Sequence, residues 1–397
     1  MQRASHTIRY TPIILITLTL FLRLGIAASS FRIDGDFADW NGVETLARDP
    51  KGDATGAFDV TQVFAASRGS MLYLRFDTGT VLNIQNGPDN EGTLLIQLDL
   101  PSQKQLILDT RGRQAYVSDK RDVRIPWAHL KYVVGPTYAQ DEFEIQIDLG
   151  LFDVGPGDSV QIQLGGSDQL DRPVAYTLSQ PSTPPAHRSS HRQSGTDVRI
   201  VSFNTYVEGL SDPNRAQAMR RLLNAAGGDI YCFQEEWDST GIADIMSRLV
   251  PLDRGRSWYV HKVRGNVIAS KYPLKALPSR NNSYAAACVD LRGKPLVVMS
   301  VHLSAMGYIQ SKEDLWRIQQ AKTIREAVDG IYAGAYDDVI PSRTKPGLVM
   351  VGDFNLVGSR TPIDLLIHEK TAGLKDWLVR NLVGESVTTW RGGLNSG

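Results

Sequence analysis

The stretch Leu348-Val349-Met350-Val351-Gly352-Asp353-Phe354-Asn355 is an apolar run that stops at two polar side chains. A short apolar run of this kind, rich in β-branched residues and bounded by glycine, is typical of a buried strand. Side chains that follow such a strand lie at the rim of a sheet, where a rigid scaffold positions them for chemistry. The sequence therefore predicts that Asp353 and Asn355 stand at one sheet edge.

Three other apolar runs in the same half of the chain end in a comparable way. They end in polar residues suited to acid–base or metal chemistry: Asn204 after 198–203, Glu235 shortly after 229–233, and His302 after 296–301. The intervening stretch 214–226 is amphipathic and is stopped by Gly227-Gly228, which predicts a helix. Alternating strands and helices from residue 197 onward predict an α/β domain.

These strand ends combine an amide, two carboxylates and an imidazole, a set that suits metal-assisted hydrolysis. Hard oxygen ligands select Mg²⁺, Mn²⁺ or Ca²⁺. A metal and an imidazole together neutralise charge on a phosphoryl oxygen, and an aspartate orients the attacking water. A single histidine at a strand end is as often structural as functional. Four such strand ends in one domain indicate a site.

Five motifs from residue 197 onward resemble the endonuclease/exonuclease/phosphatase superfamily and occur in its order. They are S-F-N at 202–204, D-I-Y-C-F-Q-E at 229–235, G-N-V-I-A-S-K-Y-P-L at 265–274, V-H-L at 301–303 and G-D-F-N at 352–355. The superfamily includes secreted deoxyribonucleases, bacterial sphingomyelinases and inositol-phosphate phosphatases. The resemblance implies a four-layer α/β/β/α sandwich in which two sheets pack together with helices outside.

The resemblance also implies a role for each matching residue. Asn204 and Glu235 would stand on the metal side, with Glu235 the direct ligand of Mg²⁺, or of Mn²⁺ or Ca²⁺. His302 would contact the scissile phosphate, Asp353 would position the nucleophilic water, and Asn355 would donate to the phosphoryl oxygens. Glu236 is adjacent to Glu235, but successive strand residues face opposite ways, so we expect it to point away from the site.

The sequence departs from the family pattern at its end. Family members finish with a strand carrying an Asp and then an Asp-His pair that supplies an acid/base histidine. The region around Trp390 resembles the lead-in to that strand, and no histidine follows His368. We expect a domain truncated at its C-terminus, so that residues 28–397 alone have little or no turnover. An inactive domain and a histidine supplied in an unusual way are the alternatives.

Residues 28–180 show a different pattern, with short period-two runs separated by turn signals. Strand candidates are 71–76, 93–98, 143–147 and 160–164. Many short strands at this spacing predict an all-β sandwich that precedes the α/β domain.

The opening of this front half, Ile33-Asp34-Gly35-Asp36-Phe37-Ala38-Asp39-Trp40, resembles carbohydrate-binding modules of the family 9 type. The resemblance implies a sandwich and a possible glycan partner. A sugar site would need exposed aromatic rings, and this half has two tryptophans, Trp40 and Trp127; core packing is the favoured interpretation of Trp40. The aspartates at 34, 36 and 39 fit either a solvated turn, which is favoured, or a calcium site.

Two further segments set the predicted organisation of the chain. Arg3 and Arg9 precede the apolar run 12–22 and a small-residue site at 25–27, which predicts a cleaved export signal over 1–27 rather than an uncleaved anchor. The protein would then be secreted, periplasmic or on the cell surface, and would meet the membrane only during export. Residues 181–196 are rich in proline and serine and predict a linker to the domain at 197–397.

Charge and cysteine content narrow the function. Lys+Arg and Asp+Glu are both 43, so the chain is formally neutral, which disfavours a polybasic nucleic-acid binder. Cys232 and Cys288 sit in apolar strand-like runs, which favours two buried thiols over a disulfide between them. The sequence thus predicts an exported divalent-metal-dependent phosphoric ester hydrolase, of phosphodiesterase or endonuclease type, acting on DNA, lipid or a small phosphodiester. An inactive surface glycan-binding protein and a phosphomonoesterase remain as alternatives.

Overall fold

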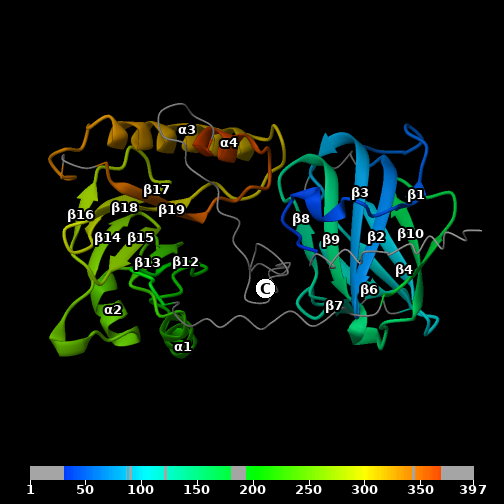
Figure 1. Ribbon diagram of the computed structural model, residues 1–397, viewed down its shortest axis with the longest axis horizontal. Helices are drawn as coiled ribbons and strands as arrows, with labels where there is room; N and C mark the ends of the chain where they lie inside the picture. The colour runs from blue at the N-terminus through cyan, green and yellow to red at the C-terminus, as the bar shows by residue number, and fades with distance from the viewer. Residues whose placement is uncertain are drawn as a thin grey trace, which may run out of the picture.

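The computed structural model describes residues 31–85, 87–88, 92–119, 123–179, 194–341 and 345–367, which form two lobes (Figure 1). The predicted export signal, most of the predicted linker and the region from His368 to Gly397 lie outside the described residues. None of the helices in the described ranges has the length and hydropathy needed to cross a bilayer.

The front lobe is built from two mainly antiparallel sheets, as the period-two pattern predicts. The first holds β1 (Thr45–Arg48), β2 (Val60–Arg68), β3 (Met71–Leu82), β9 (Gln140–Asp148) and β8 (Val133–Gly135), in that order. The second holds β11 (Val174–Thr177), β10 (Ser159–Gly166), β4 (Leu94–Asp99), β5 (Gln105–Asp109), β6 (Gln114–Val117) and β7 (Arg124–Ile125). Short 3₁₀ turns lie at η1 (Phe37–Trp40) and η3 (Leu149–Phe152).

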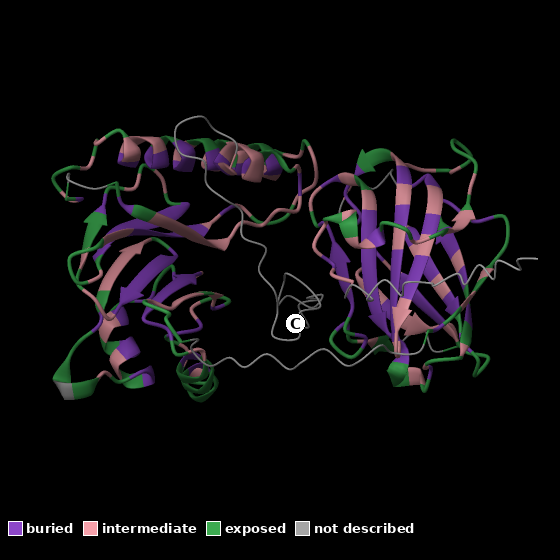
Figure 2. Cartoon of the chain, viewed as in Figure 1, coloured by how far each residue is buried: buried purple, intermediate pink, exposed green. Residues whose placement is uncertain are grey.

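One apolar core joins the two sheets of the front lobe. Leu72, Leu74 and Phe76 of β3 and Leu94, Ile96 and Leu98 of β4 all belong to it. Their spacing of two residues makes β4 alternate between buried and partly exposed side chains, whereas β3 begins with four buried residues because Met71 and Tyr73 pack in a second cluster with Trp40; Figure 2 shows burial along the lobe. The front lobe is therefore a β-sandwich whose inner faces supply its core.

The second lobe contains two four-stranded sheets of mixed direction. One holds β12 (Ile200–Asn204), β13 (Ile230–Gln234), β15 (Asn266–Ser270) and β14 (Tyr259–Val263); the other holds β16 (Leu274–Leu277), β17 (Tyr284–Asp290), β18 (Pro295–His302) and β19 (Gly347–Asp353). The helices are α1 (Ala216–Ala226), α2 (Ile242–Leu249), α3 (Lys312–Tyr332) and α4 (Thr361–Ile367), with a 3₁₀ turn η4 (Asp253–Gly255). α1 begins two residues later than predicted, and Gly227 ends it in the left-handed region at φ 59°.

Burial on both faces explains why the strands of this lobe are continuously apolar. In β13, Tyr231 and Phe233 pack with buried residues of α1 and α2, whereas Ile230 and Cys232 pack against the other sheet. The other sheet is covered on its far side by α3 and α4 (Figure 1). β-rich packing with few helices agrees with the predicted α/β class.

Both cysteines are free thiols, as predicted. Cys232 lies between the two sheets, and Cys288 lies in the separate core between its sheet and α3. The two side chains belong to different layers, so they have no common space in which to pair.

The tryptophan of the front motif belongs to the core. Trp40 is 3% exposed, and its indole N–H donates to Oε2 of Glu144 at 3.0 Å. Trp127 is 4% exposed and stacks on Tyr132. Neither predicted aromatic therefore presents a face to a sugar, and the resemblance to carbohydrate-binding modules stays a prediction.

The motif aspartates bond to their own turn. Asp34 accepts from the Asp36 N–H, Asp36 accepts from the Ala38 N–H, and Asp39 accepts from the Arg32 N–H. Arg32 also forms ion pairs with Asp34 and Asp39. This arrangement fits the favoured interpretation of a turn rather than a calcium site.

Glu144 anchors this turn and makes the front lobe sensitive to pH. Burial raises the pKa of Glu144 from 4.5 to about 7, although N–H groups of Asp34, Gly35 and Trp40 donate to the carboxylate. Between those two values the unfolded chain carries fewer protons at this position than the folded chain. Stability is therefore lost as the pH rises through this window, by up to about 1.4 kcal/mol per pH unit.

We predict that Glu144→Gln removes this contribution to the pH dependence of stability, which corresponds to one titrating proton, because an amide does not titrate. The measurement is Tm from pH 5 to 8 for the wild type and the variant in the same buffers. The Tm of the variant should differ from that of the wild type by an amount that does not depend on pH, because the glutamine NH₂ group now faces an N–H donor. Parallel curves for the two proteins across the window would contradict the assignment.

Candidate active site

The two sheets of the second lobe bring their strand ends to one place. β12 and β13 are parallel, with Asn204 opposite Gln234, and β18 and β19 are parallel, with His302 opposite Asp353. The sheets face each other so that β12 contacts β19 and β13 contacts β18. Parallel strands end at the same edge, so four chain segments deliver polar residues to one rim.

One amide joins the two sheets at this rim. Nδ2 of Asn204 donates to Oε1 of Glu235 at 2.8 Å and to Oδ2 of Asp353 at 2.9 Å. Oδ1 of Asn204 accepts from the Tyr206 N–H, and Oε2 of Glu235 accepts from the Val207 N–H. The predicted residues Asn204, Glu235 and Asp353 are thus in direct contact, although 149 residues separate the first from the last.

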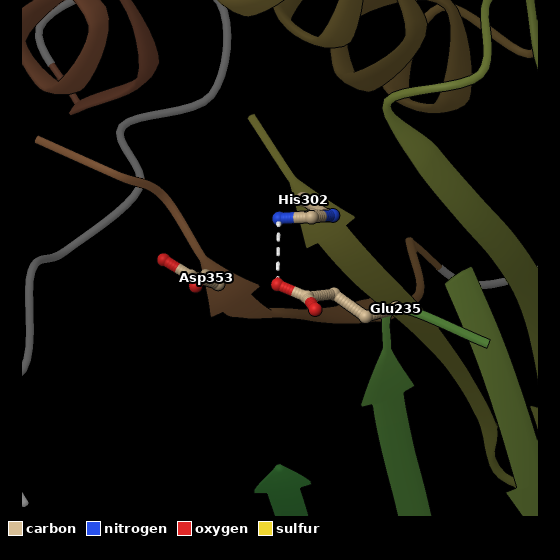
Figure 3. A group of neighbouring side chains, drawn as sticks. All are labelled: Glu235, His302 and Asp353. Atoms are coloured by element: carbon tan, nitrogen blue, oxygen red, sulfur yellow. Dashed lines mark ion pairs between the residues drawn. The ribbon is translucent and has the colours of Figure 1, made fainter. Parts of the chain in front are cut away.

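His302 completes the group. Its Nε2 lies 3.8 Å from Oε1 of Glu235, an ion pair when the imidazole is protonated. Ligand atoms of Glu235, His302 and Asp353 all lie within 4.8 Å of one another, and Figure 3 shows the three side chains gathered at their strand ends. The ring of Trp237, which is 40% exposed, lies 6.0 Å from the imidazole.

Asn355 lies beside this group but is occupied by the backbone. Its Nδ2 donates to the Leu303 carbonyl at 2.9 Å, and its N–H donates to Oδ1 of Asp353 at 3.1 Å. The first bond ties the end of β19 to the end of β18, and the second stays within the end of β19, where it orients the Asp353 carboxylate. In this state Asn355 fixes the rim and orients Asp353.

The side chains at the rim suit a hard divalent cation. Two carboxylates and an imidazole offer ligand atoms within reach of a single ion. Asn204 turns its NH₂ group toward both carboxylates, so as placed it is a donor to the ligands and not itself a ligand. Its predicted place on the metal side, and the roles predicted for the other residues, stay predictions.

Glu236 points away from the group, as expected, although both glutamates lie beyond the end of β13 and Glu235 has a positive φ, so strand alternation is not the cause. It is fully buried and accepts from the Thr205 hydroxyl, the Leu210 N–H and the Ser239 hydroxyl. A charged side chain is stable at such a depth only when its oxygens are satisfied. Glu236 therefore fastens the loops that follow β12 and β13 and so supports Glu235.

The rim backbone is strained where the site residues stand. Glu235 and Asn355 have φ of 69° and 45°, and Tyr206, Val207 and Glu208 follow one another with positive φ. Such conformations cost of order 1–3 kcal/mol each and persist where the surroundings fix them. Arg215 supplies part of that fixing, because its guanidinium donates to the carbonyls of residues 205, 206 and 207.

A buried arginine holds the loop after His302. Arg317 is fully buried and donates to the carbonyls of Ser304 and Met306, while Gln320 accepts from the Ser304 N–H. The sequence shows Arg317 and Gln320 as a polar pair on one stretch of helix, which favours packing or a salt bridge. In the structure, both residues hydrogen-bond to the loop after His302. Arg317 also forms an ion pair with Asp314 at 3.5 Å.

Asn83 of the front lobe contacts both loops of the rim, a contact that sequence reasoning did not find. Its Oδ1 accepts from the Ile309 N–H at 2.7 Å, and its Nδ2 donates to the carbonyls of Val357 and Gly358 at 3.0 and 3.1 Å. The first loop follows His302 and the second follows Asn355. The side chain is 2% exposed. No local pattern around Asn83 signals a partner more than 200 residues away.

Other bonds extend this contact between the lobes. The Ala139 N–H donates to Gly358 O, Thr137 donates to Leu356 O, and Arg360 donates to the Tyr138 hydroxyl. A cavity of about 700 Å³ lies beside the contact, lined among others by Arg111 and Arg113 of the front lobe and by residues 306–308. The front lobe thus takes part in shaping the surroundings of the rim.

Comparison with known proteins gives weak similarity. No family model matches the chain, and no curated protein sequence matches it. Solved structures similar to it include an AP endonuclease from Archaeoglobus fulgidus (12% identity, 43% of this chain and 68% of that chain, TM-score 0.31). Others are truncated TDP2 from Caenorhabditis elegans (17% identity, 40% and 62%, TM-score 0.28) and a β-hairpin deletion mutant of beta toxin from Staphylococcus aureus (21% identity, 43% and 72%, TM-score 0.30).

These neighbours are enzymes of the endonuclease/exonuclease/phosphatase type, which the sequence motifs also resemble. The similarity covers less than half of this chain, and this chain spans less than two thirds of the TDP2 chain. At these identities and TM-scores the similarity assigns no activity to this protein.

We predict that Asn83→Ala loosens the loop after His302 without unfolding the lobe that carries it. Loss of one hydrogen bond of about 1–1.5 kcal/mol accelerates exchange of the Ile309 amide by about tenfold. Hydrogen exchange read at Ile309 is the measurement. Asn224→Ala is the matched control, because its amide bonds to carbonyls of Arg220 and Leu249 away from the rim. Unchanged exchange at Ile309 in Asn83→Ala would refute the coupling.

Proposed function

We propose that the protein is an exported, divalent-metal-dependent hydrolase of phosphoric esters, of phosphodiesterase or endonuclease type, with the front sandwich as an accessory module. The observation that carries the proposal is the group of Glu235, His302 and Asp353, bridged by Asn204 at the meeting point of two sheets. Each of these residues stands in a motif that resembles the endonuclease/exonuclease/phosphatase superfamily. The proposal includes that family's four-layer α/β/β/α arrangement, which the core packing on both sides of each sheet supports.

Glu235 would hold the metal, with Mg²⁺ as the proposed ion and Mn²⁺ or Ca²⁺ as substitutes, and Asp353 would lie beside that ion. Two carboxylates this close repel each other, and the Asn204 amide offsets only part of that repulsion. When bound, the cation supplies Lewis-acid polarisation of a phosphoryl oxygen. Asn204 keeps both carboxylates turned toward the shared space.

The remaining residues of the chain act on the phosphate and on water. The imidazole of His302 faces the same space as Glu235 and stabilises negative charge that develops on the phosphoryl oxygens. Asp353 accepts from the Asn355 N–H through Oδ1, which leaves its carboxylate oriented to hold the attacking water. Asn355 becomes a donor to the phosphate when substrate displaces its bond to Leu303.

The rim also indicates what surrounds the phosphate. Tyr206, Val207, Trp237 and Met306 are exposed apolar side chains, and each belongs to a loop that follows a proposed site residue. Apolar side chains around a polar centre suit a substrate with an apolar or aromatic group next to its phosphate, which both nucleotides and lipids have. The proposal also includes export, which rests on the signal predicted at residues 1–27. It includes a glycan partner for the front lobe, which rests on the resemblance at residues 33–40.

We predict metal-dependent hydrolysis of bis-p-nitrophenyl phosphate that is lost in Glu235→Gln. The variant keeps the shape of the side chain but removes one ligand charge, so turnover falls by at least ~100-fold, as for loss of a principal electrostatic group. Activity is measured on the product of the whole gene, with Mg²⁺ or Mn²⁺ and with chelator. p-Nitrophenyl phosphate is assayed in parallel, because preference for it would favour a phosphomonoesterase.

The control for this test is Glu208→Gln. Glu208 lies on the same rim but turns its carboxylate toward the Asp238 N–H and the Ser239 hydroxyl. The Glu208→Gln variant should retain most of the hydrolytic activity. The proposal is wrong if the folded wild type binds neither Mg²⁺ nor Mn²⁺ and hydrolyses neither ester. That result would favour the alternative of an inactive domain.

We predict that His302→Gln lowers kcat without changing the metal concentration needed for half-maximal activity. His302 is assigned to the phosphate, so its loss removes charge stabilisation in the reaction, whereas Glu235 still holds the ion. The measurement is the dependence of residual activity, and of calorimetric Mn²⁺ binding, on metal concentration. A weaker metal affinity in this variant would instead make His302 a ligand.

A further inference from the structure

A second group of carboxylates lies in the front lobe, remote in sequence from the candidate active site. Asp49 and Asp53 belong to the connection between β1 and β2, and Asp168 follows β10. One oxygen from each lies within 4.8 Å of the others. Because β1 and β2 belong to one sheet and β10 to the other, the group joins the two sheets at one end of the sandwich.

Among the described residues, no ion pair balances the charge of this group. Asp59 and Asp171 lie near enough to add further negative charge to Asp168 and Asp49, respectively. Within the described ranges, no lysine or arginine forms an ion pair with any of these five aspartates.

The hydrogen bonds of the group leave one buried oxygen without a donor. Asp168 accepts from the N–H groups of Val60 and Gln169. Oδ2 of Asp49 is fully buried and has no hydrogen-bond partner. A buried, unsatisfied carboxylate oxygen is costly, and a fold retains one where something else binds it.

The titration of Asp49 agrees with this geometry. Burial, followed by the charges of Asp168, Asp53 and Asp171, raises the pKa of Asp49 to about 6. The carboxyl group is therefore destabilised in its charged form by its surroundings. A bound cation would stabilise the charged carboxylate and so offset both the burial and the neighbouring negative charges.

We propose that Asp49, Asp53 and Asp168 bind a divalent cation, Ca²⁺ by preference, that ties the β1–β2 connection to the end of β10. The available ligands are carboxylate oxygens of a loop and a strand end, and Ca²⁺ accepts such irregular oxygen coordination, whereas Mg²⁺ demands a near-ideal octahedron. The ion stabilises the sandwich and has no part in the hydrolysis proposed for the other lobe. This site is distinct from the Asp34–Asp39 turn, whose carboxylates bond to their own backbone and to Arg32.

The test uses the whole chain carrying Glu235→Gln, which weakens cation binding at the rim, and follows thermal unfolding in EDTA and in Ca²⁺. At a Ca²⁺ concentration about 100-fold above Kd, the front-lobe transition should rise by roughly 5–10 °C. An equal ionic strength of NaCl is the salt control. Failure of the proposed hydrolase leaves this result unaffected, because the rim residue is already replaced.

Asp49→Asn gives the decisive comparison, because its effect on Tm should have opposite signs in EDTA and in Ca²⁺. In EDTA the variant removes a repelled buried charge and raises Tm, whereas in Ca²⁺ it removes a ligand and loses most of the Ca²⁺-induced rise. Asp53→Asn, at an exposed position, keeps the test available if Asp49→Asn does not fold, and it also should lose the Ca²⁺ response. Asp99→Asn, an exposed aspartate at the end of β4, is the matched control and should keep it.

Two results would overturn the proposal. One is a Tm of the Glu235→Gln chain that responds to Ca²⁺ no more than to NaCl. The other is a full Ca²⁺ response in Asp49→Asn and Asp53→Asn. Calorimetric titration separates the sites further, since Asp53→Asn should lose one Ca²⁺ per chain and Asp99→Asn none.

Discussion

The bond network of one amide, Asn204, holds together the part of the molecule on which its proposed chemistry depends. Its NH₂ group donates to Glu235 and to Asp353, two carboxylates that come from different sheets. Two like charges at this distance would separate if nothing stood between them. The amide is neutral, so it fixes their positions without cancelling their charge, and the space they share stays attractive to a cation.

The rest of the second lobe serves to bring those ends together. Strands buried on both faces stack two sheets closely, and parallel pairing on each sheet places Asn204 beside Gln234 and His302 beside Asp353. Buried polar residues then stiffen the loops that leave the rim: Glu236 on one side and Arg317 on the other. Asn83 shows that the front lobe contributes to the same task, since it bonds to the loops after His302 and after Asn355. The sandwich is therefore a structural neighbour of the rim as well as a candidate binding module.

The chain has one cluster of carboxylates at the rim and another in the sandwich, and the two clusters differ in their partners and in their exposure. At the rim, an amide and an imidazole accompany the carboxylates, and every site side chain is partly accessible, which suits a centre that exchanges ions and substrate. In the sandwich, three carboxylates meet with no ion-paired lysine or arginine among the described residues, and one oxygen is buried without a donor, which suits an ion held for stability. Accessibility and partners, rather than the number of acids, separate the two interpretations.

Much of this protein could be predicted from the sequence, because period and apolar content are local properties. Alternation in the front half and continuous apolar strands in the back half gave the two fold classes, and the polar residue at each strand end gave Asn204, Glu235, His302 and Asp353 as candidates. The predicted direction of Glu236 is correct, but its cause is tertiary: β13 ends at Gln234, and the loops after β12 and β13 supply the donors to the Glu236 carboxylate. The tertiary structure decided which of these side chains touch, that Asn204 presents its NH₂ group, and that Trp40 lies in the core. It also decided the contacts of Asn83 and the meeting of Asp49 with Asp168. Those contacts join residues more than 100 positions apart, and their distances depend on how sheets and lobes pack, which no local pattern encodes.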